Sequence, residues 1–202
     1  MKEEFSEFYG RNAWGCEETV SGAGSSLKST EKFRGELSAL ISELGVKSIL
    51  DCPCGDFNYM REVNLDGIRY VGGDIVDDLI MLNREKYSAP NVDFEVIDLS
   101  KDKLPKCDLI VVKDLFLHLY IEEVQLCIEN IRKSGIKWAL LDHDHFTIIN
   151  KSPLTRNGDH RYNLTIEPFE LHAPLKTLEI ETIYEAEFNK IAKYMRCLWE
   201  MK

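Results

Sequence analysis

The chain has 202 residues, a length typical of one domain, and 44% of them are hydrophobic and 30% charged. This apolar content is enough for one core and too high for a disordered chain. With 25 Lys and Arg against 35 Asp and Glu, the net charge is −10. Because binding a nucleic-acid backbone requires clustered cations, we expect no nucleic-acid partner.

Neither the first residues nor the apolar runs indicate a secretory or membrane protein. The segment MKEEFSEFYG is acidic and lacks an apolar signal core, and no apolar run approaches the roughly 20 residues that span a bilayer. We therefore interpret the six cysteines as reduced thiols of a cytoplasmic protein. Cys52 and Cys54 have no second pair at zinc-ligand spacing, so no structural zinc is expected.

Short apolar segments, each followed by an acidic residue, alternate with helical patterns in the middle of the chain. The expected strands are residues 48–52, 69–74, 92–97, 108–113 and 136–141. Helices are expected at about 30–44, 77–87 and 121–134, and Gly45 stands where the first should end. This alternation predicts βαβ crossovers and a parallel sheet covered on both faces.

The last third of the chain departs from this alternation. Residues 143–171 are irregular, whereas residues 175–184 and 193–199 have the pattern of strands. The two strands are close enough in sequence to pair as an antiparallel hairpin at the edge of the sheet.

Five predicted strands end in an acid: Asp51, Asp74, Asp98, Asp114 and Asp142. Ligands of open α/β sheets bind beyond the carboxyl ends of the strands, so these acids should share one cleft. The turn DCPCGD at residues 51–56 lacks the glycines that let a backbone approach a pyrophosphate. Asp74 follows Asp51 by 23 residues, about the spacing at which an acid binds ribose hydroxyls. S-adenosylmethionine, a nucleoside without a pyrophosphate, satisfies both observations.

These segments resemble class I S-adenosylmethionine-dependent methyltransferases. Residues 49–56 resemble their first motif, Asp74 their ribose-binding acid, residues 96–98 their adenine-proximal motif, and residues 109–119 the segment after their fourth strand. The chain also resembles a small bacterial subfamily associated with surface-polysaccharide gene clusters. The shared segments are SGAGSS at 21–26, DCPCGDF at 51–57, LPKCDLI at 104–110, NLTIEPF at 163–169 and LW at 198–199. The first motif of the wider family usually carries three glycines. This turn keeps Gly55 alone and has Pro53 and Phe57 at the other two positions.

The resemblance implies a Rossmann-like fold with a seven-stranded, mostly parallel sheet and a C-terminal antiparallel hairpin, and S-adenosylmethionine as cofactor. It implies one domain in four parts: a flap and helix at 1–45, a cofactor-binding core at 46–142, an acceptor loop at 143–171 and a terminal strand pair at 172–202. The expected cofactor-binding residues are Ser25, Asp51, Cys52, Pro53, Gly55, Asp56, Phe57, Asp74, Ile75, Asp98, Leu99 and Lys113.

Two clusters are candidates for acid–base chemistry. Asp114 and His118 are four residues apart, so one helical turn would place both on one face. They are either a structural pair, or a general base (His118) with an acid that holds its tautomer. The run DHDH at 142–145 is a base site, a divalent-metal site or the polar start of a loop. The catalytic candidates are His118, Asp114 and His143, and no resident metal is expected.

Residues 150–163 carry Lys151, Arg156 and Arg161 against Asp159, a local positive charge in an acidic chain. This indicates either an ordinary mixed surface loop or a pocket for an anionic acceptor, in which arginine binds phosphate or carboxylate. The acceptor-binding candidates are Arg156, His160, Arg161 and Asn163.

Together with the subfamily resemblance, this loop predicts O-methylation of a small, sugar-like or phosphorylated molecule. Two alternatives stay open: a non-catalytic S-adenosylmethionine-binding module, and a metal-dependent enzyme centred on residues 142–145.

Overall fold

A seven-stranded sheet forms the middle of the molecule, which the computed structural model describes over residues 1–156, 160–185 and 190–201. The strands are β1 (Ser48–Asp51), β2 (Arg69–Asp74), β3 (Val92–Val96), β4 (Leu109–Val112), β5 (Trp138–His143), β6 (Lys176–Glu185) and β7 (Lys190–Glu200). Their order across the sheet is β3-β2-β1-β4-β5-β7-β6. Strands β1 to β5 run parallel, whereas β7 runs antiparallel to both β5 and β6. The predicted fold class is confirmed.

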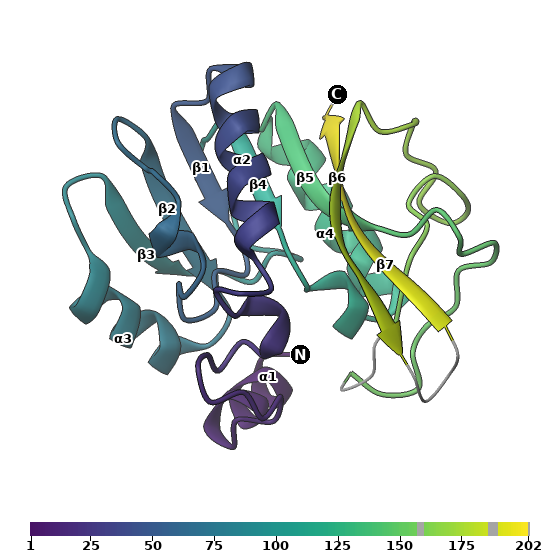
Figure 1. The fold of residues 1–202 in the computed structure, drawn as a ribbon, viewed down its shortest axis with the longest axis horizontal. Coiled ribbons are helices and arrows are strands. Elements are labelled where there is room, and N and C mark those ends of the chain that lie inside the picture. The colour runs from purple at the N-terminus through teal and green to yellow at the C-terminus, as the bar shows by residue number, and fades with distance from the viewer. Residues whose placement is uncertain (157–159, 186–189, 202) are drawn as a thin grey trace.

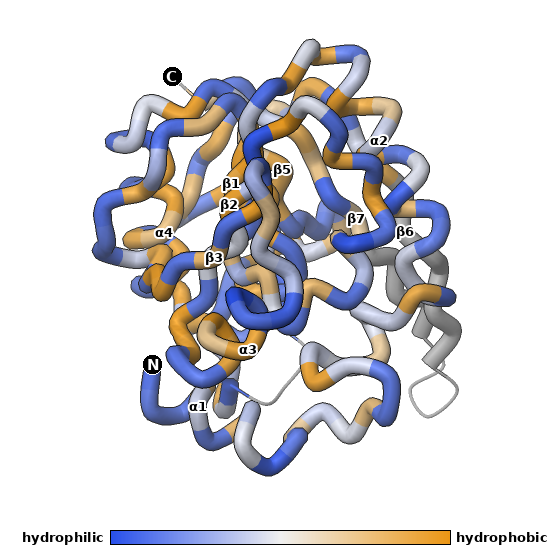
Figure 2. The backbone as a smooth tube through the Cα atoms, turned by 90° about the vertical axis from the view of Figure 1, so that its left-hand side faces the viewer, coloured by the Kyte–Doolittle hydropathy of each residue, from blue (hydrophilic) through white to orange (hydrophobic). Residues whose placement is uncertain are grey.

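Helices cover both faces of the sheet, because successive strand side chains point into two separate cores. Helix α2 (Glu31–Leu44) packs on the face that carries Ile49 and Leu109. Helix α4 (Ile121–Ser134) packs on the opposite face, with Leu50 and Ile110. Figure 1 shows α2 in front of the sheet and α4 behind it, with α3 (Asp77–Tyr87) beside β3. In Figure 2 the hydrophobic residues concentrate in the strands of the interior.

The ends of the predicted elements agree with the structure to within a few residues. Helix α2 ends before Gly45, whose φ of 65° lies in the left-handed region that glycine adopts without strain. Strand β5 extends beyond its predicted end at residue 141. Asp142 and His143 therefore belong to the strand, where they pair with Arg196 and Met195 of β7.

Helix α1 (Lys2–Gly10) was not predicted. Its buried residues Phe5 and Phe8 are spaced like one face of a helix, which is the signal that could have found it. In Figure 1 this helix lies beyond the carboxyl ends of β1 and β4. Its position makes the N-terminal segment part of the site described below.

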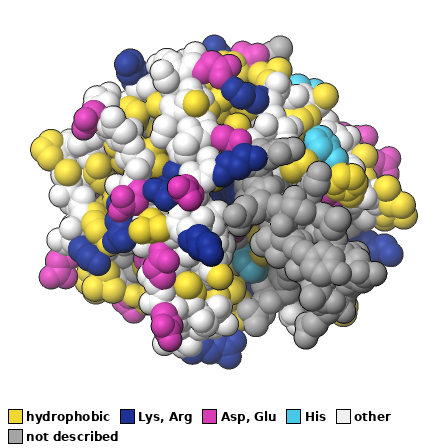
Figure 3. Space-filling view, viewed as in Figure 1, with side chains coloured by type: hydrophobic (Ala, Val, Ile, Leu, Met, Phe, Trp, Pro, Cys, Tyr) yellow, Lys and Arg dark blue, Asp and Glu magenta, His cyan; other side chains and the backbone are white. Residues whose placement is uncertain are grey.

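The surface and the helices add two observations. On the face drawn in Figure 3, cationic and anionic side chains are interspersed. Within the described ranges, no helix has the length and apolar character needed to cross a membrane.

Candidate active site

A cavity lies beyond the carboxyl ends of the parallel strands and encloses about 1020 Å³, open solvent included. Segments at the ends of four strands line it: residues 52–56 after β1, 74–76 at β2, 97 and 99 after β3, and 113–115 after β4. The N-terminal region supplies a further part of the wall, through Phe5, Tyr9, Trp14, Val20, Ser21 and Ser25 among others, and Tyr59, Leu79, His118, Leu119 and Cys127 complete it.

Most residues predicted to bind the cofactor line this cavity. They are Ser25, Cys52, Pro53, Gly55, Asp56, Asp74, Ile75, Leu99 and Lys113. Asp51, Phe57 and Asp98 do not line it. Asp142 is also absent from the wall, so the expectation that all five strand-end acids share one cleft is wrong. Asp74 and Asp114 are the two of the five that reach the cavity.

The three exceptions have other partners. Asp51 is fully buried and accepts hydrogen bonds from the hydroxyls of Tyr70 (2.9 Å) and Tyr59 (3.4 Å). Burial raises its pKa to about 7, although the Tyr70 hydrogen bond opposes the shift. The ring of Phe57 packs against that of Tyr70, with centroids 5.1 Å apart. The carboxylate of Asp98 accepts from the Ser100 hydroxyl at 2.5 Å and pairs with Lys101.

The turn after β1 is in direct contact with the N-terminal segment. Gly55 has a φ of +53°, and a Cβ at this position would lie 2.1 Å from the Ser21 hydroxyl oxygen. The carboxylate of Asp56 accepts from the Thr19 hydroxyl (2.8 Å), the Val20 N–H (3.1 Å) and the Ser21 hydroxyl (3.2 Å). Residues 19–21, which belong to the predicted flap and helix at 1–45, are therefore held against the turn.

Asp74 presents a fixed carboxylate on the cavity wall. One oxygen accepts from the N–H of Gly55 (3.2 Å) and the other from the N–H of Val76 (3.1 Å). Burial raises its pKa to about 6, and these backbone hydrogen bonds limit the rise. The side chain thus sits in an apolar setting where hydroxyl donors from a ligand would stabilise its charge.

Four charged side chains meet at the end of β4: Lys113 and Arg196, which are buried, and Asp114 and Asp142, which are partly buried. Asp114 forms ion pairs with both Lys113 and Arg196, and the Nε of Arg196 lies 3.2 Å from Asp142. Burial acts to raise the pKa of Asp114, but the two cations hold it at about 2. Burial lowers the pKa of Lys113 and raises that of Asp142. Arg196 was missed by the sequence analysis, because only the pairing of β7 with β5 brings it here.

Lys113 also connects β4 to the N-terminal segment. Its ammonium lies 3.0 Å from the Gly24 carbonyl oxygen and 3.4 Å from the Ser25 hydroxyl. The turn Ala23–Ser25 is therefore held from β4, while residues 19–21 are held by Asp56.

His118 lines the cavity, and a backbone carbonyl determines its tautomer. Its Nδ1 lies 2.7 Å from the carbonyl oxygen of Arg156. Because a carbonyl oxygen can only accept, Nδ1 carries the proton of this hydrogen bond. The expectation that Asp114 holds this tautomer is wrong, since its carboxylate pairs with Lys113 and Arg196. His118 lies on a 3-10 turn (Phe116–His118) and not on the helical turn that the spacing suggested.

Arg156 is buried within the protein and does not face an acceptor. Its guanidinium binds both carboxylate oxygens of Glu123, at 2.5 and 2.6 Å, and its Nε lies 2.8 Å from Glu4. These hydrogen bonds raise its pKa although burial opposes them. The prediction that Arg156 binds an anionic acceptor is therefore wrong. Arg156 instead links α1, which carries Glu4, to α4, which carries Glu123.

The other acceptor candidates also lie off the cavity wall. The side chain of Asn163 donates to the Thr147 carbonyl (3.0 Å) and accepts from the Thr165 hydroxyl (2.7 Å), so it stabilises the loop itself. The ring of His160 packs on Tyr162, with centroids 4.9 Å apart, and Arg161 is half-buried. Asp159 lies outside the described residues.

His143, His145 and Cys197 bring potential metal-ligand atoms within 4.8 Å of one another. The Nδ1 of His143 accepts the N–H of Leu164 at 3.1 Å, so its Nε2 carries the proton and faces Nδ1 of His145 at 2.8 Å. A metal-bound histidine instead donates its second N–H. The arrangement does not fit a metal ion, which would require deprotonating Nε2 while Nδ1 faces a donor. His143 is also absent from the cavity wall, and burial lowers its pKa to about 4.

Comparison of the sequence with known proteins gives a partial match. No protein-family model matches the chain. A putative methyltransferase, 235L of Invertebrate iridescent virus 6, is 32% identical over 113 residues, which are 52% of this chain and 42% of that protein. The match therefore spans less than half the length of this relative.

Solved structures with a similar fold cover between 83% and 100% of this chain. Magnesium protoporphyrin IX methyltransferase from Synechocystis PCC 6803, with bound S-adenosylhomocysteine, has a TM-score of 0.64 at 11% identity and covers 100% of this chain and 99% of its own. The chain has the class I methyltransferase fold. A second structure is the 1,6-didemethyltoxoflavin-N1-methyltransferase of Burkholderia thailandensis with bound 1,6-didemethyltoxoflavin and S-adenosylhomocysteine. It has a TM-score of 0.63 at 13% identity, and the match covers 100% of this chain and 87% of that one. TehB from Haemophilus influenzae has a TM-score of 0.59 at 19% identity and covers 83% and 62%.

Proposed function

We propose that the protein binds S-adenosylmethionine in this cavity and methylates a small molecule. The observation that carries the proposal is the Asp74 carboxylate, which is buried, fixed by two backbone N–H groups and placed on the cavity wall. Support comes from the class I methyltransferase fold and from similar structures that hold S-adenosylhomocysteine.

The residues on the wall match the parts of such a cofactor. Asp74 suits the ribose hydroxyls, because a buried carboxylate gains most from added donors. Ile97 and Leu99 present apolar surface for the adenine, while Gly55, which has no Cβ, allows Ser21 to pack against the turn. Lys113 and Ser25 also line the cavity, with the ammonium 3.4 Å from the hydroxyl, and suit the amino-acid part. When bound, the cofactor supplies an electrophilic methyl group.

His118 is the candidate general base of the proposed reaction. In the neutral form of this ring the lone pair is on Nε2, which can take the proton of an acceptor hydroxyl. We therefore keep O-methylation as part of the proposal. The prediction of a phosphorylated or sugar-like acceptor rested on the subfamily resemblance and on the basic loop, and the pairing of Arg156 with Glu123 removes the support from the loop's Arg156. Membership of the polysaccharide-associated subfamily stays a prediction.

The cellular location is also proposed on chemical grounds. All six cysteines are free, and four of them are buried. Free thiols are typical of reducing compartments, so we propose that the protein acts in the cytoplasm.

Calorimetric titration with S-adenosylhomocysteine tests the cofactor site. Asp74→Asn keeps the shape of the side chain and removes its charge. Since hydrogen bonds to a charged group contribute about 1.5–3 kcal/mol, we expect binding about ten- to a hundredfold weaker. Asp93→Asn is the matched control: Asp93 is exposed on neighbouring β3, and the variant should bind like the original protein. Equal affinity for all three proteins would place the ribose elsewhere, and no binding at all would refute the proposal.

A further inference from the structure

The part of the cavity around His118 is aromatic and apolar. The His118 ring lies 5.5 Å from the Trp14 ring and 6.4 Å from the Phe5 ring, between centroids. Leu115 and Leu119 line the same region. Such a wall gains free energy by removing apolar surface from water, and it offers flat faces against which another ring can pack.

Trp14 also lines the cavity and carries a polar group. Its Nε1 is buried and has no hydrogen-bond partner among the residues that the structure describes. Buried polar groups are almost always paired, so this indole N–H calls for an explanation. Neighbouring residues hold the Trp14 side chain in place. Its ring packs on the Phe8 ring, with centroids 5.7 Å apart, and the backbone of Gly22 lies so close that a Cβ there would be 3.1 Å from the Trp14 Cβ. An oxygen atom on a bound molecule is the acceptor that this N–H lacks.

The charges on the wall disfavour an anion. Counting lysines and arginines over the described part of the chain, Lys113 is the one that lines the cavity, and it is paired with Asp114. Arg156 faces Glu4 and Glu123 instead of the cavity. The carboxylates of Asp56 and Asp74 also line the wall and would repel a phosphate group.

From these observations we infer that the methyl acceptor is a neutral, planar arene or heteroarene that carries a hydroxyl group. It would pack among Phe5, Trp14 and His118, with an oxygen accepting the Trp14 N–H. In the transfer, the hydroxyl oxygen bonds to the methyl carbon, the electron pair of the broken carbon–sulfur bond stays on sulfur, and the hydroxyl proton passes to Nε2 of His118. The inference rests on the proposed function, because it names the acceptor for that same site.

The test uses 2-naphthol as a planar probe and titrates it into protein saturated with S-adenosylhomocysteine. Saturation fills the nucleoside part of the cavity, so that binding reports the remaining part. We expect Trp14→Ala to bind 2-naphthol about tenfold more weakly, because the substitution removes an aromatic contact and a hydrogen bond. Trp14→Phe keeps a ring without the N–H, and a loss of about threefold is expected.

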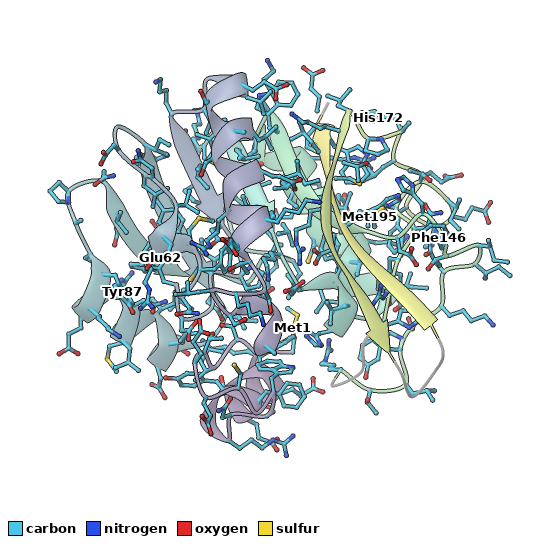
Figure 4. All side chains as sticks on the ribbon, in the orientation of Figure 1. Met1, Glu62, Tyr87, Phe146, His172 and Met195 are labelled. Carbon is cyan, nitrogen blue, oxygen red and sulfur yellow. The ribbon has the colours of Figure 1, made fainter. Side chains whose placement is uncertain are left out.

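Phe146→Ala is the matched control, because Phe146 is an aromatic residue that is 71% exposed. It lies across the β6–β7 pair from Met1, the first residue of the N-terminal segment (Figure 4). This variant should bind 2-naphthol within twofold of the original protein.

The outcomes separate the two proposals. If S-adenosylhomocysteine binds but 2-naphthol does not, or if glucose 6-phosphate binds in its place, the acceptor class is wrong and the proposed function stands. Equal probe affinity in Trp14→Ala and Phe146→Ala would also overturn the acceptor class. If S-adenosylhomocysteine does not bind, the proposed function fails and the inference fails with it.

Discussion

Removal of the Arg156 side chain should destabilise the protein strongly, although the residue lies in an irregular loop. Its side chain is only 5% exposed and forms a two-point ion pair with Glu123, whose side chain is 21% exposed. Taking one partner from a buried pair leaves a buried charge uncompensated, which costs about 3–5 kcal/mol. In Arg156→Ala, Glu123 would still accept the Tyr120 N–H at 3.0 Å. The expected loss is therefore at the lower end, about 3 kcal/mol.

Thermal unfolding measures this effect. For a protein of about this size, 1 kcal/mol shifts the melting temperature by roughly 2–4 °C, so Arg156→Ala should melt about 6–12 °C lower. Lys133→Ala is the matched control on the same helix α4. It removes the Lys133–Glu129 ion pair, whose side chains are 70% and 57% exposed, and should leave the melting temperature unchanged.

A double substitution separates the charge effect from lost packing. Arg156→Leu with Glu123→Leu removes both charges, and replacing a buried pair by apolar side chains is often close to neutral. The double variant should therefore recover most of the loss seen in Arg156→Ala. If Arg156→Ala melts like Lys133→Ala, the ion pair with Glu123 contributes nothing and the assigned role of Arg156 is wrong.

Three further predictions concern single sites. Nitrogen NMR of labelled histidine should show His118 protonated at Nδ1 and His143 at Nε2, because a carbonyl faces the first and an N–H faces the second; the same tautomer at both would contradict these contacts. Gly55→Ala should lower both stability and S-adenosylhomocysteine affinity, since its φ of +53° and the nearby Ser21 hydroxyl leave no room for a Cβ, whereas Gly35→Ala in α2, with nothing within 4 Å, should stabilise the protein slightly. Burial raises the pKa of Asp51 to about 7, so the folded state holds a proton that the unfolded state has lost between about pH 4 and 7, and stability falls as pH rises through this range. In Asp51→Asn the free energy of unfolding should decrease less between pH 5 and pH 8 than in the original protein. Urea unfolding at the two pH values measures this difference.

The secondary structure of the parallel half could be predicted because its signals are local. The strand at residues 69–74 and the helices at 77–87 and 121–134 have the bounds that the apolar patterns indicated. Gly45 ends α2 because a left-handed residue suits the end of a helix. Helix α1 was not predicted, although Phe5 and Phe8 have helical spacing, because the segment around them is mostly polar.

The cofactor side of the site was also largely predictable. In a parallel sheet the strand ends share one edge, so residues next to those ends, such as Asp74 and Gly55, reach the same cavity. The sequence did not determine which of the side chains at the strand ends face the cavity. Asp51 points instead toward two buried tyrosines, and Asp98 toward its own loop.

The partners of the charged side chains were decided by the tertiary structure alone. Arg156 meets Glu4, 152 residues away, and Arg196 meets Asp114, 82 residues away. A local excess of basic residues shows the net charge of a loop, but it does not show which acids the packing of α1, α4 and β7 brings beside it. The sequence by itself determined the sheet, its helices and the edge at which a nucleoside would bind. Only the folded chain decided that Arg156 is neutralised within the protein, that a backbone carbonyl orients His118, and that Trp14 and Phe5 form the wall beside it, because contacts between distant segments exist only after the layers have packed.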